Sequence, residues 1–374
     1  MERKIDMNYV CSACKSSYTL ESNKWKCDCG GLLHLEYEKK KVNFFETAHS
    51  QEMSLWKYAD SMPFEKDDVW REITLGEGNT PLIRISENLL AKAEYYMPTL
   101  SFKDRGAVVL VAMAKKLGID RVVADSSGNA GTSIAAYGAR AGIQCDIFVP
   151  ESTSEKKLKQ IEAHGATVHK IPGNRENTSN AAIAMVEERN LFYASHIFNP
   201  LFWEGTKTYI YEVFEQLNGK LPGAFIIPVG NGTLIMGAFI AIQELMSNGH
   251  IQEMPKILAV QAASCAPIFK AFEEGKTSVE AGENKGTIAE GIAIAAPARG
   301  TEILEAIRAT GGDIIGVSEE SILQARNELA LKGVYVEITS AANYAGYLQY
   351  LEKYPKLREQ QVVMPLCGAG IKSN

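Results

Sequence analysis

Short apolar runs alternate with longer helical stretches along most of this 374-residue chain, and this alternation restricts the possible folds most strongly. Runs rich in Val, Ile and Phe, such as residues 145–149 and 224–228, are bounded by turn-forming residues. Helical stretches of about 10–15 residues separate such runs. This order is typical of βαβ units with parallel strands, so we predict the α/β fold class.

The expected elements fall into two blocks, separated near residues 195–205. The first block is expected to contain strands at 121–124, 145–150, 166–171 and 191–194, and helices at 104–117, 129–140, 154–164 and 176–190. The second is expected to contain strands at 224–228, 257–261, 313–317 and 362–365. Residues 42–75 are rich in aromatic side chains and show no regular period. Two α/β domains therefore follow a smaller N-terminal unit.

Composition and charge exclude several classes of protein. Apolar residues make up 46% of the chain and charged residues 22%, with a net charge of −6. This mild acidity disfavours a nucleic-acid partner, and no apolar run is long enough for a membrane span. The first six residues are polar and lead into no apolar signal segment, and the seven cysteines are an odd number. We therefore expect a cytoplasmic protein with no nucleic-acid or membrane partner.

Lys103 stands at the expected start of a helix, within the sequence Ser101-Phe102-Lys103-Asp104-Arg105-Gly106. A helix N-terminus carries partial positive charge, which disfavours the ammonium form of a lysine. An amine with a lowered pKa is what imine chemistry requires. The alternative is an ordinary exposed lysine in a first helical turn.

Three small-residue loops follow expected strands. Gly230-Asn231-Gly232-Thr233-Leu234 precedes a helix and offers the backbone N–H groups of a phosphate site. Ser126–Thr132 occupies the same place in the earlier block and suits a carboxylate. A loop that contains Cys367 follows the last strand. Each loop alone could be a plain turn, but ligands bind at the carboxyl ends of parallel strands, where all three fall.

Several motifs in order resemble one family. Gly76–Leu82, Pro98–Gly106, the Ser-Ser-Gly-Asn loop, the 230–234 loop, Glu337–Ala342 and the Cys367 loop resemble the fold-type II (tryptophan synthase β-like) pyridoxal-phosphate enzymes, and threonine synthases in particular. The resemblance implies two doubly wound open-sheet domains and a homodimer that acts on a small amino acid. We place a four-cysteine unit at 1–41, a large cofactor-binding domain at 42–106 plus 200–374, and a smaller domain at 107–199.

The resemblance also implies a role for each site residue. Lys103 would carry pyridoxal 5'-phosphate as a Schiff base and then move the substrate's α-proton. Asn129 would contact the cofactor's phenolic oxygen, and Cys367 its pyridine nitrogen. The residues of the phosphate site would be Gly230, Asn231, Gly232, Thr233 and Leu234. Those around the substrate would be Ser127, Gly128, Asn129, Ala130 and Phe202.

Phe202 departs from the family pattern. Threonine synthases usually have an arginine at this position, within an Asn-Pro motif that is Asn199-Pro200 here, and that arginine binds the phosphate of the substrate. Phenylalanine offers no charge-assisted hydrogen bond, although Arg175 or His196 could compensate. We predict a threonine synthase-like lyase that converts O-phosphohomoserine to threonine. The alternative is a threonine/serine ammonia-lyase or another eliminating or replacing enzyme.

A non-catalytic regulator that binds the cofactor is the second alternative. The lysine, the phosphate loop and the carboxylate loop are all present, which favours an enzyme, because a regulator needs no complete set.

Four cysteines cluster near the N-terminus, with the spacing Cys11-x2-Cys14-x12-Cys27-x-Cys29, before Gly30-Gly31. Four thiolates are a standard structural zinc site. The second pair is closer than the usual Cys-x2-Cys, so a metal-free, degenerate ribbon is the alternative. Lys/Arg and Asp/Glu are nearly balanced in residues 1–40, so we expect a structural role rather than nucleic-acid binding.

Overall fold

The computed structural model describes residues 7–64 and 68–372. The chain forms two compact units: unit 1 within Met1–Gly78 and Lys103–Thr206, and unit 2 within Asn79–Phe102 and Lys207–Asn374. Among the described residues, none of the helices combines the length and apolar character needed to cross a bilayer. Both units are α/β, as predicted from the alternation of strands and helices.

Unit 2 contains a six-stranded sheet in the order β12-β11-β10-β13-β5-β4. All neighbouring strands are parallel except β4 and β5. The strands are β4 (Leu82–Arg84), β5 (Leu89–Lys92), β10 (Ala224–Pro228), β11 (Lys256–Ala262), β12 (Asp313–Val317) and β13 (Val362–Pro365). The four strands predicted for the second block are therefore confirmed.

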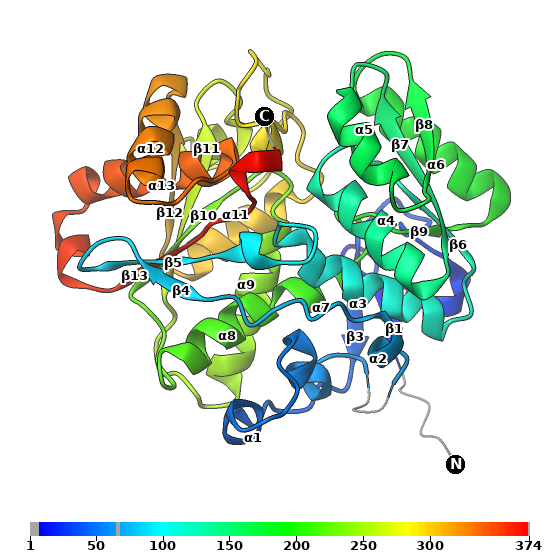
Figure 1. The fold of residues 1–374 in the computed structure, drawn as a ribbon, viewed down its shortest axis with the longest axis horizontal. Coiled ribbons are helices and arrows are strands. Elements are labelled where there is room, and N and C mark those ends of the chain that lie inside the picture. The colour runs from blue at the N-terminus through cyan, green and yellow to red at the C-terminus, as the bar shows by residue number, and fades with distance from the viewer. Residues whose placement is uncertain (1–6, 65–67, 373–374) are drawn as a thin grey trace. The chain divides into compact units, whose positions relative to one another are not determined.

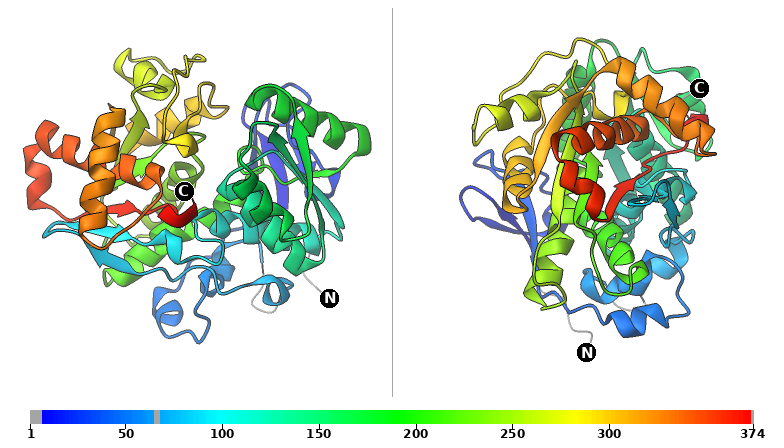
Figure 2. Two further views of the ribbon diagram at one scale, coloured as in Figure 1. Left: turned by 45° about the horizontal axis from the view of Figure 1, so that its top comes forward. Right: turned by 90° about the vertical axis from the view of Figure 1, so that its left-hand side faces the viewer.

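Helices cover both faces of this sheet. α12 (Glu319–Leu331) and α13 (Ile338–Lys353) lie on one face, and α9 (Thr233–Ser247) and α11 (Gly300–Ala309) lie on the other (Figure 1 and Figure 2). α8 (Thr208–Gln216) packs against α9, and α10 (Pro267–Glu273) packs near β12. Because both faces are covered, the central strands are continuously apolar, as in Phe225-Ile226-Ile227.

Unit 1 contains a parallel four-stranded sheet in the order β8-β7-β6-β9. Its strands are β6 (Arg121–Ala124), β7 (Gln144–Pro150), β8 (Thr167–Ile171) and β9 (Phe192–Tyr193). Its helices are α3 (Lys103–Lys116), α4 (Asn129–Ala141), α5 (Glu155–Glu162), α6 (Arg175–Arg189) and α7 (Leu201–Thr206). All four strands of the first predicted block are present, and α3 packs against both α4 and α7.

The N-terminal part of unit 1 begins with a three-stranded antiparallel sheet, which we call the ribbon. It consists of β1 (Met7–Cys11), β2 (Ser17–Thr19) and β3 (Leu33–Tyr37), in the order β2-β1-β3. α1 (Phe44–Ala48), a 3-10 helix at Leu55–Ser61 and α2 (Trp70–Ile73) follow.

Residues 42–78 group with unit 1, whereas the sequence placed 42–106 with the larger domain. Trp56 explains this grouping, because its ring stacks on Trp70 with centroids 5.0 Å apart. Its Nε1 also donates to Glu77, and the same carboxylate accepts from the hydroxyl of Tyr137 on α4 at 3.0 Å. The aromatic-rich stretch is thus packed against α4.

Candidate active site

Lys103 is the first residue of α3, as the sequence predicted, and its side chain is partly buried. Its Nζ lies 5.6 Å from the centre of the Phe202 ring on α7. Gly106, one turn further along α3, allows this arrangement, because a Cβ there would lie 2.2 Å from Phe202 Cδ1. The structure therefore brings together two of the predicted site residues, the lysine and the unusual phenylalanine.

A buried hydrogen bond joins the start of α3 to α4. The Ser133 hydroxyl on α4 donates to Asp104 Oδ1 at 2.5 Å, and neither side chain is exposed. Asp104 directly follows Lys103, so this bond holds the helix that carries the lysine against the helix that begins at Asn129.

The predicted carboxylate loop joins β6 to α4. Gly128 is the N-cap residue of this 13-residue helix, so Ser127, Gly128, Asn129 and Ala130 all lie at its N-terminus. Gly131 makes the turn tight, because a Cβ there would lie 1.8 Å from the Ser126 carbonyl oxygen. A helix N-terminus attracts anions through its dipole and its first N–H groups. The local geometry suits a carboxylate, as the sequence indicated.

His196 lies in the segment that leads to α7, and its ring centroid is 6.0 Å from that of Phe202. Burial holds the pKa of His196 well below its ordinary value, and the positive charges of Lys103 and Arg175 act in the same direction. His196 is therefore a neutral imidazole near pH 7. It can exchange hydrogen bonds with a ligand but offers no charge to a phosphate.

Asp125 is a buried residue that sequence reasoning missed. It follows β6 directly, its Oδ1 has no hydrogen-bond partner among the described residues, and burial raises its pKa. Tyr193, Ser179 and Arg175 oppose that rise. Its place at the carboxyl end of a strand, next to Ser126, was the signal that could have identified it.

The predicted phosphate loop joins β10 to α9 in unit 2. Gly232 is the N-cap residue of the 15-residue helix and has φ +76°. There is no room for side chains on this loop: a Cβ on Gly232 would lie 2.4 Å from Ile303, and one on Gly230 would lie 2.9 Å from Ile294. Asn231 is partly exposed, whereas Thr233 and Leu234 are buried in the first turn. The loop is thus a backbone cradle at a helix N-terminus.

The Cys367 loop follows β13 and is attached to the residues that precede Lys103. The Cys367 carbonyl accepts from the Phe102 amide at 2.9 Å, and Gly368 forms a β-bridge with Ser101. Ser101 is fully buried, and its hydroxyl has no hydrogen-bond partner among the described residues. Cys367 itself is buried. The loop therefore presents a thiol, beside an unsatisfied hydroxyl, close along the chain to Lys103.

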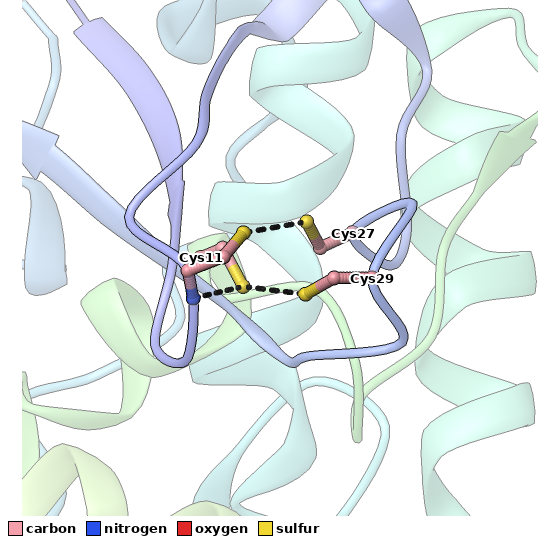
Figure 3. A group of neighbouring side chains, drawn as sticks. Cys11, Cys27 and Cys29 are labelled. Atoms are coloured by element: carbon pink, nitrogen blue, oxygen red, sulfur yellow. Dashed lines mark hydrogen bonds between the residues drawn. The ribbon is translucent and has the colours of Figure 1, made fainter.

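The four N-terminal cysteines converge in the ribbon, where Figure 3 shows three of them. All four Sγ atoms lie within 4.8 Å of one another; Cys11 and Cys29 are 3.6 Å apart, and Cys14 and Cys27 are 3.4 Å apart. A tetrahedral zinc site with Zn–S bonds of about 2.3 Å has sulfur atoms about 3.8 Å apart. Hydrogen bonds with Ser16 lower the pKa of Cys14 to about 6, which favours the thiolate. The donor set fits zinc in number, chemistry and spacing.

Comparisons with known proteins agree with this geometry. The family model described as pyridoxal-phosphate dependent enzyme matches residues 73–368. The chain is 34% identical to a threonine synthase of Methanocaldococcus jannaschii, over 97% of this chain and 92% of that protein. It is 35% identical to a threonine synthase of Mycobacterium leprae, over 84% and 87%. This chain therefore belongs to the pyridoxal-phosphate-dependent enzyme family, and threonine synthases are among its similar relatives.

Solved structures show the same fold. A bacterial threonine deaminase, from the source abbreviated T.th., matches with a TM-score of 0.63 and 28% identity, over 75% of this chain and 87% of that one. A fungal L-serine ammonia-lyase from Rhizomucor miehei matches with a TM-score of 0.68 and 24% identity, over 78% and 93%. The second likeness concerns the fold alone.

Proposed function

We propose that this enzyme is a pyridoxal-phosphate-dependent carbon–oxygen lyase that forms threonine from O-phosphohomoserine. The observation that carries the proposal is the position of Lys103 at a helix N-terminus that is bonded to the carboxylate loop. The threonine synthase relatives, which match along nearly the whole chain, support the same reaction.

The proposed cofactor contacts come from groups that suit its chemistry. Lys103 would hold pyridoxal 5'-phosphate covalently, and the glycine cradle at 230–234 would bind its phosphate through backbone N–H groups. Asn129 would contact the phenolic oxygen and Cys367 the ring nitrogen. The unsatisfied Ser101 hydroxyl also fits a site that binds a polar group. When bound, the cofactor supplies an electron sink for negative charge at the substrate's α-carbon.

The residues of the chain perform the remaining work. The N-terminus of α4 would bind and orient the substrate carboxylate through the 127–130 loop. The Lys103 amine would take the α-proton and return it, because a positioned amine is a general base. A thiol at Cys367 brings no negative charge to the ring nitrogen, which favours elimination and replacement over transamination.

A second candidate function is ammonia-lyase activity on threonine or serine, and the place of Phe202 favours it. The ring is fully buried beside Lys103, where an arginine would bring a cation for the substrate's phosphate. The neutral His196 does not replace that charge. The threonine deaminase structure has a similar fold.

One panel assay tests both functions. The holoenzyme is incubated separately with O-phosphohomoserine, threonine and serine, while phosphate, threonine, ammonia and 2-oxo acid are measured. Release of phosphate with equal formation of threonine supports the synthase. Release of ammonia and a 2-oxo acid from threonine or serine supports the lyase. A yellow protein that turns over none of these contradicts both and favours the non-catalytic regulator.

We also propose that Cys11, Cys14, Cys27 and Cys29 bind one structural zinc ion, which completes a zinc-ribbon-like unit. Metal analysis of protein purified without added chelator or metal tests this, and one zinc per chain is expected. A homodimer in the cytoplasm that takes a small amino-acid substrate and no nucleic acid is our expectation for its assembly and location. Sedimentation measures the oligomeric state directly.

A further inference from the structure

The ribbon packs against one particular stretch of unit 1, residues 193–204, which we call the bridging segment. Trp25, in the loop between the two cysteine pairs, makes edge-on contacts with Tyr193 and Phe198. The ring centroids are 5.8 Å and 5.1 Å apart. Such edge-to-face pairs have a preferred geometry, so they fix orientation as well as burying area.

The end of the ribbon makes polar contacts with the same segment. The Tyr37 hydroxyl donates to Glu204 Oε2 at 2.6 Å, and Lys39 Nζ lies 3.8 Å from Oε1 of the same carboxylate. Glu204 is buried and belongs to α7. The His34 ring also lies beside Trp203, with centroids 6.2 Å apart. Contacts at both ends of the bridging segment therefore come from the ribbon.

The bridging segment also carries the residues that face the lysine. Phe202 lies beside Lys103 Nζ and fills the space that Gly106 leaves. Backbone bonds from Asn199 N to Ser195 O and from Phe202 N to Asn199 O, both 3.1 Å, make the segment one connected turn. Movement at its ribbon side would therefore displace Phe202.

The cysteine cluster controls where Trp25 lies. Trp25 is two residues before Cys27, whose N–H donates to the Gly31 carbonyl at 3.0 Å and whose carbonyl accepts from Gly30 N at 2.8 Å. Closing the four sulfur atoms around one ion fixes this turn and the loop that leads into it.

We propose that the ribbon, closed by its four cysteines, is a positioning device for the substrate side of the lysine site, with Trp25 as its main positioning residue. The inference rests on the proposed functions of Lys103 and of the cysteine cluster. A metal site that would otherwise only stabilise the chain then also sets how the bridging segment presents Phe202 to the substrate.

The test compares Trp25→Ala with Trp25→Phe in the full-length holoenzyme. Kinetics use the amino acid that the wild type turns over, and amide hydrogen exchange is followed by mass spectrometry. For Trp25→Ala we expect KM to rise about tenfold, with kcat within about twofold, because ground-state placement is lost and the lysine chemistry is kept. Exchange should accelerate in residues 193–204 and not in α5 or β11, and Trp25→Phe should restore most of both effects.

Phe45→Ala is the matched control, because Phe45 is an aromatic residue of unit 1 that is 74% exposed and lies outside the ribbon. It should change neither readout. Protein depleted of metal by a chelator should show the exchange pattern of Trp25→Ala, a readout that needs no turnover. An unchanged KM in Trp25→Ala, or exchange that rises equally across the chain, overturns the proposal. If no amino acid is turned over, the proposed function fails, and the exchange pattern alone decides the inference.

Discussion

Two parts of unit 1 are held together in different ways. In the parallel sheet, the central strands β6 and β7 are almost wholly buried, and Val122, Val123 and Ile147 are fully inaccessible. In the ribbon, β2 has no buried residue, and β1 and β3 bury only Tyr9, Cys11 and Leu33. The sheet is held by apolar burial from both faces, whereas the ribbon has little apolar area to bury.

This difference explains where the cysteines are and where the chemistry is. A sheet of three short strands is too small to be stable from burial alone, so it needs a cross-link such as a metal ion. The buried sheet needs no such link and can hold Lys103 and the carboxylate loop in fixed positions. Unit 1 thus combines a scaffold that carries reactive groups with an appendage whose order depends on its thiolates.

Lys103→Ala gives the largest effect expected on this comparison, because it removes the reactive amine and leaves both parts of unit 1 folded. Activity should fall by at least about 10²- to 10⁴-fold from lost proton transfer alone. The visible absorbance of the bound cofactor should disappear, while the circular dichroism spectrum and zinc content stay as in the wild type.

Borohydride reduction of the wild type provides the positive control. It should attach the cofactor permanently to the peptide that contains Lys103. A label on Lys207 or Lys372 would contradict the assignment and move the reactive amine out of unit 1.

Metal removal gives the next largest effect and separates the two parts directly. Zinc binding contributes roughly 10–16 kcal/mol to the folding of isolated zinc-finger peptides. Chelation, or Cys14→Ser, should therefore unfold the ribbon locally while the parallel sheet persists. Hydrogen exchange should show lost protection in β1 and β3 and retained protection in β6 and β7. Equal loss in both would show that the sheet also depends on the ribbon. Cys145→Ser, which alters a buried cysteine outside the cluster, is the control and should leave zinc content unchanged.

The strength of sequence reasoning differed between these parts for a physical reason. Strand β10 and the helix that starts at Lys103 follow from local patterns, because a short apolar run and a glycine-marked helix end are visible within a few residues. The same holds for the four cysteines, whose spacing alone predicted that they converge.

What the sequence did not reveal depends on contacts between distant residues. Residues 42–75 gave no period, because their order comes from the Trp56–Trp70 stack and from Glu77, which accepts hydrogen bonds from Trp56 and Tyr137. Asp125 looked like an ordinary turn residue, since only the fold buries its carboxylate. The contact between Trp25 and the bridging segment spans well over a hundred residues and has no local signal.

Phe202→Arg has a smaller expected effect and asks what the scaffold accepts beside Lys103. Charge-assisted hydrogen bonds to a phosphate are worth roughly 1.5–3 kcal/mol each. The variant should therefore raise kcat/KM for O-phosphohomoserine by about tenfold or more if the pocket otherwise suits this substrate. Phe202→Leu is the control for lost packing against Gly106 and should bring no such gain. Efficient threonine formation by the wild type, with no gain in the variant, would mean that another cation already binds the phosphate.

Asp146→Asn gives the smallest effect and tests the parallel sheet alone. Asp146, on β7, is fully buried and accepts hydrogen bonds from Arg121 Nε at 2.6 Å and from His169 Nε2 at 2.7 Å. Burial raises the pKa of this carboxyl, but Arg121 and His169 outweigh burial and hold the pKa below its usual value. A lowered folded-state pKa stabilises the native state above the unfolded value of about 3.9, and the contribution is lost as pH falls through the folded pKa.

At pH 7 the variant should therefore lose about 1 kcal/mol of unfolding free energy, a modest figure because the Arg121 side chain is 30% exposed. The deficit should shrink as pH falls towards about 3, because the wild-type carboxylate is then increasingly protonated. Urea unfolding across this range measures it. Asp120→Asn, at an exposed neighbouring position, should change stability by less than about 0.5 kcal/mol. Zinc content should stay at the wild-type level in both variants, since neither touches the ribbon. A deficit that persists in acid would show that Asp146 acts through packing rather than charge, and the sheet would then depend on burial even more completely than the comparison with the ribbon implies.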